Sequence, residues 1–342
     1  MRHGARITLA LVALTLLLPV AAQELRLKSK VSVKKVLPGR VAFSPDGRIL
    51  AVSGQTGEGS VEPKAGGQFS MRLTNVERVV VLVDAGSFKV RKQLMKEPDQ
   101  DIFGSSPVEF SADGQRLFTL ADSSIRVWDT QDGKRIGTWG QKIARLVFSP
   151  DRRYALARLL EGTYEAFDLR DGRSLGAFPK SDEGELVIVD ADHPYLAFFR
   201  EPNLVLRNLK SGEEAVLGES ALKRLTGAAL SLDAGTLAVT GESGIVAIWN
   251  LSEKKKVSEQ PASGGDGAYS PVFAPDGSAL AYRAGKKLHY WGLHSKLLLT
   301  QDPQHVMALG KISFGNDAQT LATTGMMMDP FAKIWTVTPP SR

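Results

Sequence analysis

The stretch VAFSPDGRILAVSG, residues 41–54, contains two short apolar segments on either side of a Pro-Asp-Gly turn. Val, Phe, Ile and Leu fill the segments, and residues of this kind are common in strands. Pro, Asp and Gly favour the backbone angles of a tight turn. The stretch therefore predicts a hairpin of two antiparallel strands.

Weaker copies of this hairpin return six times along the chain. The aspartates expected in the turns are Asp46, Asp113, Asp151, Asp192, Asp233, Asp276 and Asp317. Successive aspartates are 67, 38, 41, 41, 43 and 41 residues apart, so only the first spacing is anomalous. A nearly constant period predicts a repeat architecture in which each unit buries its apolar faces against its neighbours.

A second strand-like pattern follows each hairpin. SIRVWDTQDGKRIGTW, residues 124–139, is its clearest copy. The landmark positions are Val83, Trp128, Phe167, Arg207, Trp249, Trp291 and Trp335. They keep step with the aspartates, which predicts seven units of four strands each.

These repeats resemble the WD40 family of β-propellers. The resemblance is carried by the FSPDG turns, by Val127-Trp128-Asp129 and by the IWN and IW variants, and it spans roughly residues 30–340. It implies an all-β, seven-bladed β-propeller of four-stranded antiparallel sheets. The FSPDG phrase is also similar to the propeller repeats of TolB-like periplasmic proteins, so kinship with that group stays open.

One feature of the WD40 family is missing. Its members often carry a Gly-His dipeptide before the first strand of a blade, and no Gly-His occurs in this sequence. We therefore expect the Asp-His-Ser-Trp hydrogen-bond network of many WD40 blades to be absent, and blades to be held mainly by apolar burial.

The ring needs one strand from the start of the chain. The last repeat ends at IWTVTPP, residues 334–340, and supplies only three strands. The segment KSKVSVKKVLPG, residues 28–39, has strand-like valines and no sheet of its own. We expect it to add the outer strand of the seventh sheet, which closes the ring and removes open edges.

The first 22 residues have the pattern of a signal peptide. Two arginines flank the start, and the uncharged apolar run 7–20 follows, with small residues before Gln23. The run is shorter than the roughly 20 residues of a membrane-spanning helix, although an uncleaved anchor is the alternative. We expect cleavage before Gln23, a single propeller domain over 23–342, location in the periplasm or outside the cell, no stable membrane insertion after cleavage, and a monomer.

Several kinds of chemistry are not expected. The chain has no cysteine, no G-x-S-x-G motif, and five histidines without the spacing of a metal pair. The formal net charge is +6, but the basic residues form small clusters without interleaved aromatics, so we expect no nucleic-acid partner. We predict that the protein is not an enzyme and needs no cofactor or metal.

Three long segments predict a binding surface. Residues 54–77, 96–107 and 325–331 join strands on the same face of the ring in blades seven, one and two, which are consecutive. Apolar residues are unusually common in them, and such residues on loops suit a partner. The candidate contact residues are Phe69, Met71, Ile102, Phe103, Met326, Met327, Met328 and Phe331. The alternative is that these side chains pack on one another.

The sequence thus favours an exported, non-catalytic scaffold that binds a protein or peptide on this face. The alternative is a propeller enzyme, or a binder of small ligands or metals, that uses the central channel. For that reading, Asp99 and Asp101 are the carboxylate pair on the favoured arc, near the expected channel mouth.

Overall fold

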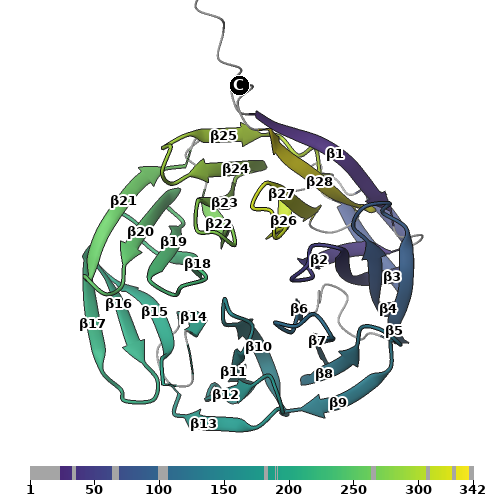
Figure 1. Cartoon of the computed structure of the whole chain (residues 1–342), viewed down its shortest axis with the longest axis horizontal. Coiled ribbons are helices and arrows are strands. Elements are labelled where there is room, and N and C mark those ends of the chain that lie inside the picture. Colours follow the sequence, from purple (N-terminus) through teal and green to yellow (C-terminus); the bar gives the residue numbers. More distant parts are fainter. Residues whose placement is uncertain are drawn as a thin grey trace, which may run out of the picture.

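Seven four-stranded antiparallel sheets surround a central axis in the computed structural model of the chain (Figure 1). The structure describes residues 24–32, 36–63, 69–98, 107–180, 184–188, 190, 192–262, 267–305, 309–325 and 329–338, with the backbone alone for 58–63 and 69–73. Every regular element among them is a strand. The predicted all-β, seven-bladed propeller is confirmed.

Each sheet is one blade, and its strands a to d run from the axis outward. Blade one contains β2 (Leu37–Phe43), β3 (Ile49–Pro63), β4 (Phe69–Asp84) and β5 (Val90–Pro98). Blade two contains β6 (Val108–Phe110), β7 (Arg116–Ala121), β8 (Ser124–Asp129) and β9 (Arg135–Trp139). Blade three contains β10 (Ile143–Phe148), β11 (Tyr154–Leu159), β12 (Tyr164–Asp168) and β13 (Ser174–Phe178). Blade four contains β14 (Glu185–Ile188), β15 (Pro194–Arg200), β16 (Asn203–Asn208) and β17 (Glu214–Glu219).

The remaining blades follow the same plan. Blade five contains β18 (Leu225–Leu230), β19 (Thr236–Gly241), β20 (Ile245–Asn250) and β21 (Lys255–Pro261). Blade six contains β22 (Ala268–Phe273), β23 (Ala279–Ala284), β24 (Lys287–Gly292) and β25 (Leu298–Gln301). Blade seven contains β26 (Leu309–Phe314), β27 (Thr320–Gly325), β28 (Phe331–Thr338) and, as its outer strand, β1 (Glu24–Ser32).

The pairing of β1 with β28 closes the ring, as the strand count predicted. The two strands lie side by side, purple against yellow in Figure 1, and pair from Glu24↔Thr338 to Ser32↔Phe331. The predicted bounds were wrong, because the strand runs over 24–32 and not 28–39. Leu37 belongs instead to β2, the inner strand of blade one.

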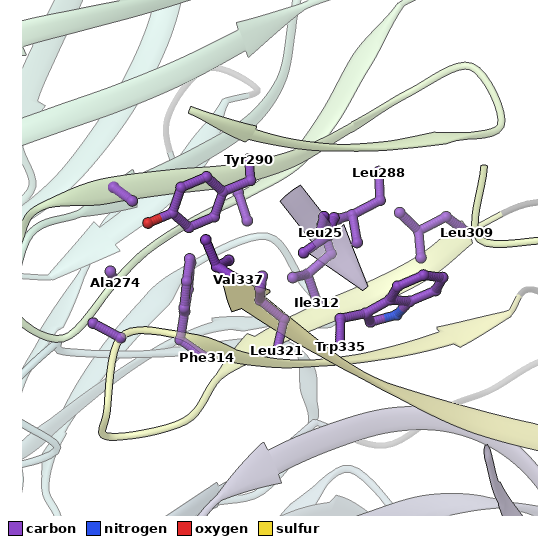
Figure 2. Close-up of a cluster of buried hydrophobic side chains, with 13 residues drawn as sticks. Leu25, Ala274, Leu288, Tyr290, Leu309, Ile312, Phe314, Leu321, Trp335 and Val337 are labelled. Carbon is purple, nitrogen blue, oxygen red and sulfur yellow. The ribbon is translucent and has the colours of Figure 1, made fainter. Parts of the chain in front are cut away.

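A β-bulge lets β1 bury side chains on both faces of blade seven. The register shifts between Leu27 and Ser29, and an extra residue reverses which face later side chains point to. Leu25 therefore packs in the cluster shared with blade six (Figure 2), whereas Val31 packs in the cluster shared with blade one. The first strand of the chain thus helps to pack blade seven against both of its neighbours, blades six and one.

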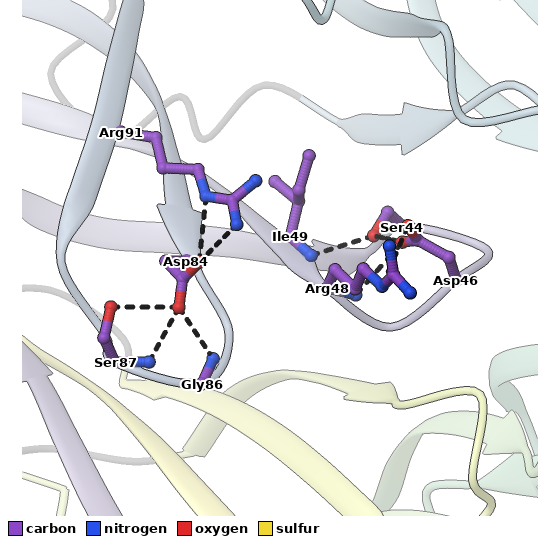
Figure 3. Close-up of polar contacts among 8 residues, drawn as sticks. All are labelled: Ser44, Asp46, Arg48, Ile49, Asp84, Gly86, Ser87 and Arg91. Atoms are coloured by element: carbon purple, nitrogen blue, oxygen red, sulfur yellow. Dashed lines mark hydrogen bonds and ion pairs between the residues drawn. The ribbon is translucent and has the colours of Figure 1, made fainter.

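A serine and an aspartate shape the turn between strands a and b. Ser44 Oγ donates to Asp46 Oδ1 at 2.6 Å and accepts the Ile49 N–H at 2.9 Å, and Asp46 Oδ1 also accepts the Arg48 N–H at 3.0 Å (Figure 3). The bond from Ser44 is the first reason why the pKa of Asp46 is lowered from its ordinary value. The same pair recurs as Ser111 with Asp113, Ser149 with Asp151, and Ser231 with Asp233. The repeated phrase is therefore a turn-forming unit.

The turn of blade four differs from the prediction. Asp190, and not Asp192, accepts the backbone N–H groups of Asp192 and His193, at 2.8 and 3.0 Å. The carboxylate of Asp192 pairs instead with Lys210 in the turn between strands c and d.

The turns between strands c and d of blades one and two have their own aspartate. Asp84 Oδ1 accepts the N–H groups of Gly86 and Ser87, at 3.1 and 2.7 Å, while Oδ2 binds Arg91 (Figure 3). These bonds, that from the Ser87 N–H first, hold the pKa of Asp84 well below its ordinary value. Asp129, the aspartate of the VWD stretch, caps the corresponding turn of blade two.

The residues inserted in blade one extend its hairpin. β3 and β4 have 15 and 16 residues, whereas strands b and c of blade two have six each. Their pairing continues past the blade from Gln55↔Arg78 to Pro63↔Phe69, with a bulge between Thr56 and Glu58. The anomalous repeat length therefore reflects a longer β-ribbon between strands b and c.

A histidine network exists in blade seven, so the expectation that none forms was wrong. His305 Nδ1 lies 2.5 Å from Asp329 Oδ2, and its Nε2 lies 2.9 Å from Thr323 Oγ1. Thr323 Oγ1 also accepts the indole N–H of Trp335 at 2.9 Å. His305 was missed because Gln304, not glycine, precedes it.

The segment that carries His305 is held from the neighbouring strand. Lys333, which is buried on β28, donates from Nζ to the carbonyl oxygens of Pro303 and Gln304, both at 2.7 Å. Blade two keeps only part of the network, in which Trp128 donates to Thr119 Oγ1 at 2.9 Å. Buried polar groups need such partners, because an unpaired one costs free energy.

Candidate binding face around the central channel

Two cavities lie on the axis, where the inner strands of the blades meet. The larger, of about 960 Å³, contains residues of the b–c turns such as Asp122 and Leu160. The smaller, of about 510 Å³, contains residues of the a–b turns such as Pro45. Both are lined by Val147, Leu186, Ala228 and Val272, so they are the two ends of one channel.

At one equivalent position of the repeat, every blade contributes a residue to the lining of the larger end. In every case it stands three places before the last residue of inner strand a. We call this set the channel ring: Arg40, Pro107, Arg145, Glu185, Gly227, Ser270 and Lys311. The residues of the channel ring occupy equivalent positions in the seven repeats, and the closure of the propeller brings them together.

Contacts within the channel ring join adjacent blades. Arg145 of blade three forms an ion pair with Glu185 of blade four. Lys311 of blade seven donates from Nζ to Ser270 Oγ of blade six at 3.5 Å. Arg40 belongs to β2 of blade one, and this blade lies between blades two and seven in Figure 1.

The larger end is electropositive. Among the described residues, the charged groups that line it are Arg40, Arg78, Arg145 and Lys311 against Asp122 and Glu185, a formal net charge of +2. Burial first, and then the positive charges of Arg40 and Arg145, lower the pKa of Lys311 to about 7. Burial, and then Arg145, lower the pKa of Arg40 to about 10. Like charges are thus held close together in a partly enclosed space.

The smaller end is more apolar. Phe148, Leu230, Phe273 and Phe314 line it, beside prolines of the a–b turns. Glu109 there lies 3.2 Å from Arg152, and burial raises the pKa of this carboxyl despite the guanidinium. The two ends of the channel therefore suit ligands of different chemistry.

Most of the predicted contact residues fall outside the described structure. Ile102, Phe103, Met326, Met327 and Met328 lie outside the described residues, as do Asp99 and Asp101 of the alternative reading. Phe69 and Met71 lie on β4, paired with Pro63 and Val61, and only their backbone is described. The predicted partner surface therefore stays a prediction.

Phe331 is the one predicted contact residue with a described side chain. It is the first residue of β28 and is half-buried. The Nζ atom of Lys30, on β1, lies 5.9 Å from the centroid of its ring. An ammonium group over an aromatic face is a favourable contact.

Two of the three predicted segments border the electropositive end of the channel. Pro98 and Pro107, at the two ends of segment 96–107, line the larger cavity, and so does Arg78, which follows segment 54–77. The sequence reasoning placed these segments on one face but missed the channel ring. A signal was present: Arg40, Arg145 and Lys311 each stand three residues before the phenylalanine that ends strand a.

The fold and these turns define the class of protein, a seven-bladed β-propeller. A family model described as "WD domain, G-beta repeat" matches residues 101–129, which include strands b and c of blade two. The chain therefore carries a WD40 repeat on a propeller, as the repeated stretches predicted.

Solved structures share this fold. A chain in "Crystal Structure of Mitotic Checkpoint Complex" is 17% identical, with a TM-score of 0.66 and 99% of each chain covered. In all, 1676 chains match, so the fold is widely used and does not by itself define a function. The search of curated proteins found no match.

Among the described residues, no three or more His, Asp or Glu side chains converge in a way that could hold a metal ion. The same part of the chain contains no helix long and apolar enough to span a bilayer.

Proposed function

We propose that this protein is an exported, non-catalytic scaffold that docks a protein or peptide on the face formed by the b–c and d–a connections. The observation that carries the proposal is the hairpin of β3 and β4, which continues past the other strands of its blade on this face. A ribbon that leaves the sheet has backbone groups along two edges, and such edges pair readily with another chain.

Two other observations support a scaffold. WD40 propellers are typically interaction platforms, and one such repeat matches here. The similar solved chain comes from the crystal structure of a complex, the Mitotic Checkpoint Complex. Export rests on the sequence of residues 1–22 alone.

The docking test removes the hairpin extension without disturbing the blade. Gln55 and Arg78 are direct partners in the register, so Asn-Gly can replace residues 56–77 as a two-residue turn. Tagged wild-type and shortened proteins are used to capture partners from an envelope extract of the source cell, with thermal melting as the check on folding. The matched control is Leu232→Ser, which changes an exposed apolar residue at the opposite end of the channel.

The expected result is a partner that binds wild-type and Leu232→Ser proteins and is lost from the shortened one. An identical set of bound proteins for all three would refute docking at the hairpin. Export is tested separately by the mass of the protein recovered from the source cell, which we expect to correspond to a chain that begins at Gln23.

A further inference from the structure

The channel ring gathers three cationic side chains in one cavity. Arg40, Arg145 and Lys311 come from blades one, three and seven, and they line the same space of about 960 Å³. Pockets of roughly 300–1,000 Å³ are typical of small-molecule sites. Because the three positions are equivalent in the repeat, they lie at one level of the channel.

The contacts of Arg145 and Lys311 with their neighbours differ. Glu185 pairs with Arg145, and Asp122 pairs with Arg126 of strand β8. No carboxylate among the described residues forms an ion pair with Lys311. Its ammonium group donates a hydrogen bond to Ser270 Oγ, with 3.5 Å between Nζ and Oγ. Guanidinium groups bind planar oxyanions through two parallel hydrogen bonds, and an ammonium group adds a point charge.

We propose that the channel ring binds a phosphate group, either as inorganic phosphate or as a small phosphate monoester, through Arg40, Arg145 and Lys311. Three cations around one cavity favour a phosphate dianion over a monoanion, because a doubly charged oxyanion makes charge-assisted hydrogen bonds with more of them. A bound dianion would also favour the charged form of Lys311, which burial and its basic neighbours now disfavour. This ligand needs no protein partner, so the proposal is independent of docking at the hairpin.

The test uses isothermal titration calorimetry on the full mature chain in a phosphate-free buffer. The probes are inorganic phosphate, glycerol 3-phosphate and, as a monoanion of similar size, acetate, all at the same ionic strength. We expect both phosphates to bind at least about tenfold more tightly than acetate, because charge-assisted bonds to three cations favour the dianion. Tighter binding of glycerol 3-phosphate than of inorganic phosphate would identify a monoester as the ligand, and equal binding would identify the free anion.

Variants locate the site. Lys311→Met and Arg40→Met are each expected to weaken phosphate binding at least about tenfold, whereas Lys311→Arg keeps it. Lys286→Met is the matched control, because Lys286 is an exposed lysine of a b–c turn on the same face and does not line the cavity. Circular dichroism and thermal melting report whether each variant is folded. Absence of phosphate binding to the folded wild-type chain, or binding that Lys311→Met leaves unchanged, would overturn the proposal.

Discussion

Trp335 and Trp249 occupy the same place in blades seven and five, but only Trp335 has a hydrogen-bond partner for its indole N–H among the described residues. Each pairs with a leucine of strand b, Leu321 and Leu237. In blade seven, the residue two places after the leucine is Thr323, which accepts the Trp335 N–H. In blade five, the residue at the same position is Val239. The Trp249 N–H is buried without a partner, because valine offers no acceptor.

Giving Trp249 an acceptor is expected to repair blade five. Val239→Thr should leave the free energy of unfolding within about 0.5 kcal/mol of wild type or raise it, because the new hydroxyl satisfies a buried donor. Val52→Thr in blade one is the control, since Val83 stands at the landmark there and no indole is present. That change should cost about 1–3 kcal/mol, as an unpaired buried hydroxyl does. Urea denaturation measures both, and equal losses would contradict the explanation.

Removing Thr323 is expected to damage blade seven more than the same change damages blade two. In Thr323→Val, both His305 and Trp335 lose a bond, and we expect a loss of about 2–4 kcal/mol. In Thr119→Val the Trp128 N–H loses its acceptor, so the loss should be about 1–2 kcal/mol. The comparison uses unfolding in urea, and a larger loss in Thr119→Val would show that the histidine network adds nothing.

The closing strand is expected to stabilise the ring through its buried residues. Val31 is 1% exposed in the cluster shared with blade one, whereas Leu27 on the same strand is 43% exposed. Val31→Ala should therefore lower the free energy of unfolding by about 2 kcal/mol. Leu27→Ala should change it by less than about 0.5 kcal/mol. Similar effects of the two changes, measured by thermal and urea unfolding, would mean that closure does not depend on this burial.

Acid is expected to weaken the a–b turns. The pKa values of Asp46, Asp113 and Asp233 are lowered, in each case first by the serine hydroxyl that donates to the carboxylate. A lowered pKa in the folded state stabilises the protein above the ordinary aspartate pKa, near 4, and this stabilisation is lost as the pH falls through the folded value. We therefore expect the triple change to asparagine to flatten the decline of the melting temperature below about pH 4. An unchanged decline would assign acid sensitivity to other groups.

Lys311 is expected to destabilise the folded protein when no anion is bound. Its pKa is lowered to about 7 from 10.5, so the unfolded chain holds the proton more strongly between these values. The penalty is complete below pH 7 and declines as the pH rises towards 10.5. In a phosphate-free buffer, Lys311→Met should be more stable than wild type by about 2 kcal/mol at pH 6, with the difference shrinking by pH 10. A pH-independent difference would contradict this account.

The sequence alone determined the architecture. Apolar alternation and Asp-Gly turns are local signals, so they predicted the hairpins directly, and counting strands then required the chain start to complete blade seven. Asp46 and Asp113 confirm the predicted turns, since each accepts an N–H group within a few residues of itself, whereas Asp192 does not form the turn predicted for it. Local hydrogen bonds depend on nearby residues, which a sequence displays.

Only the tertiary structure decided where distant side chains meet. His305 looked isolated in the sequence, but the blade brings it to Asp329 and Thr323. Arg40, Arg145 and Lys311 are far apart along the chain, and only the closed ring places them around one cavity. Local sequence places each of these residues on an inner strand. Their mutual repulsion and their burial arise only when seven blades pack about a common axis. The charge of the channel is therefore a property of the assembled ring.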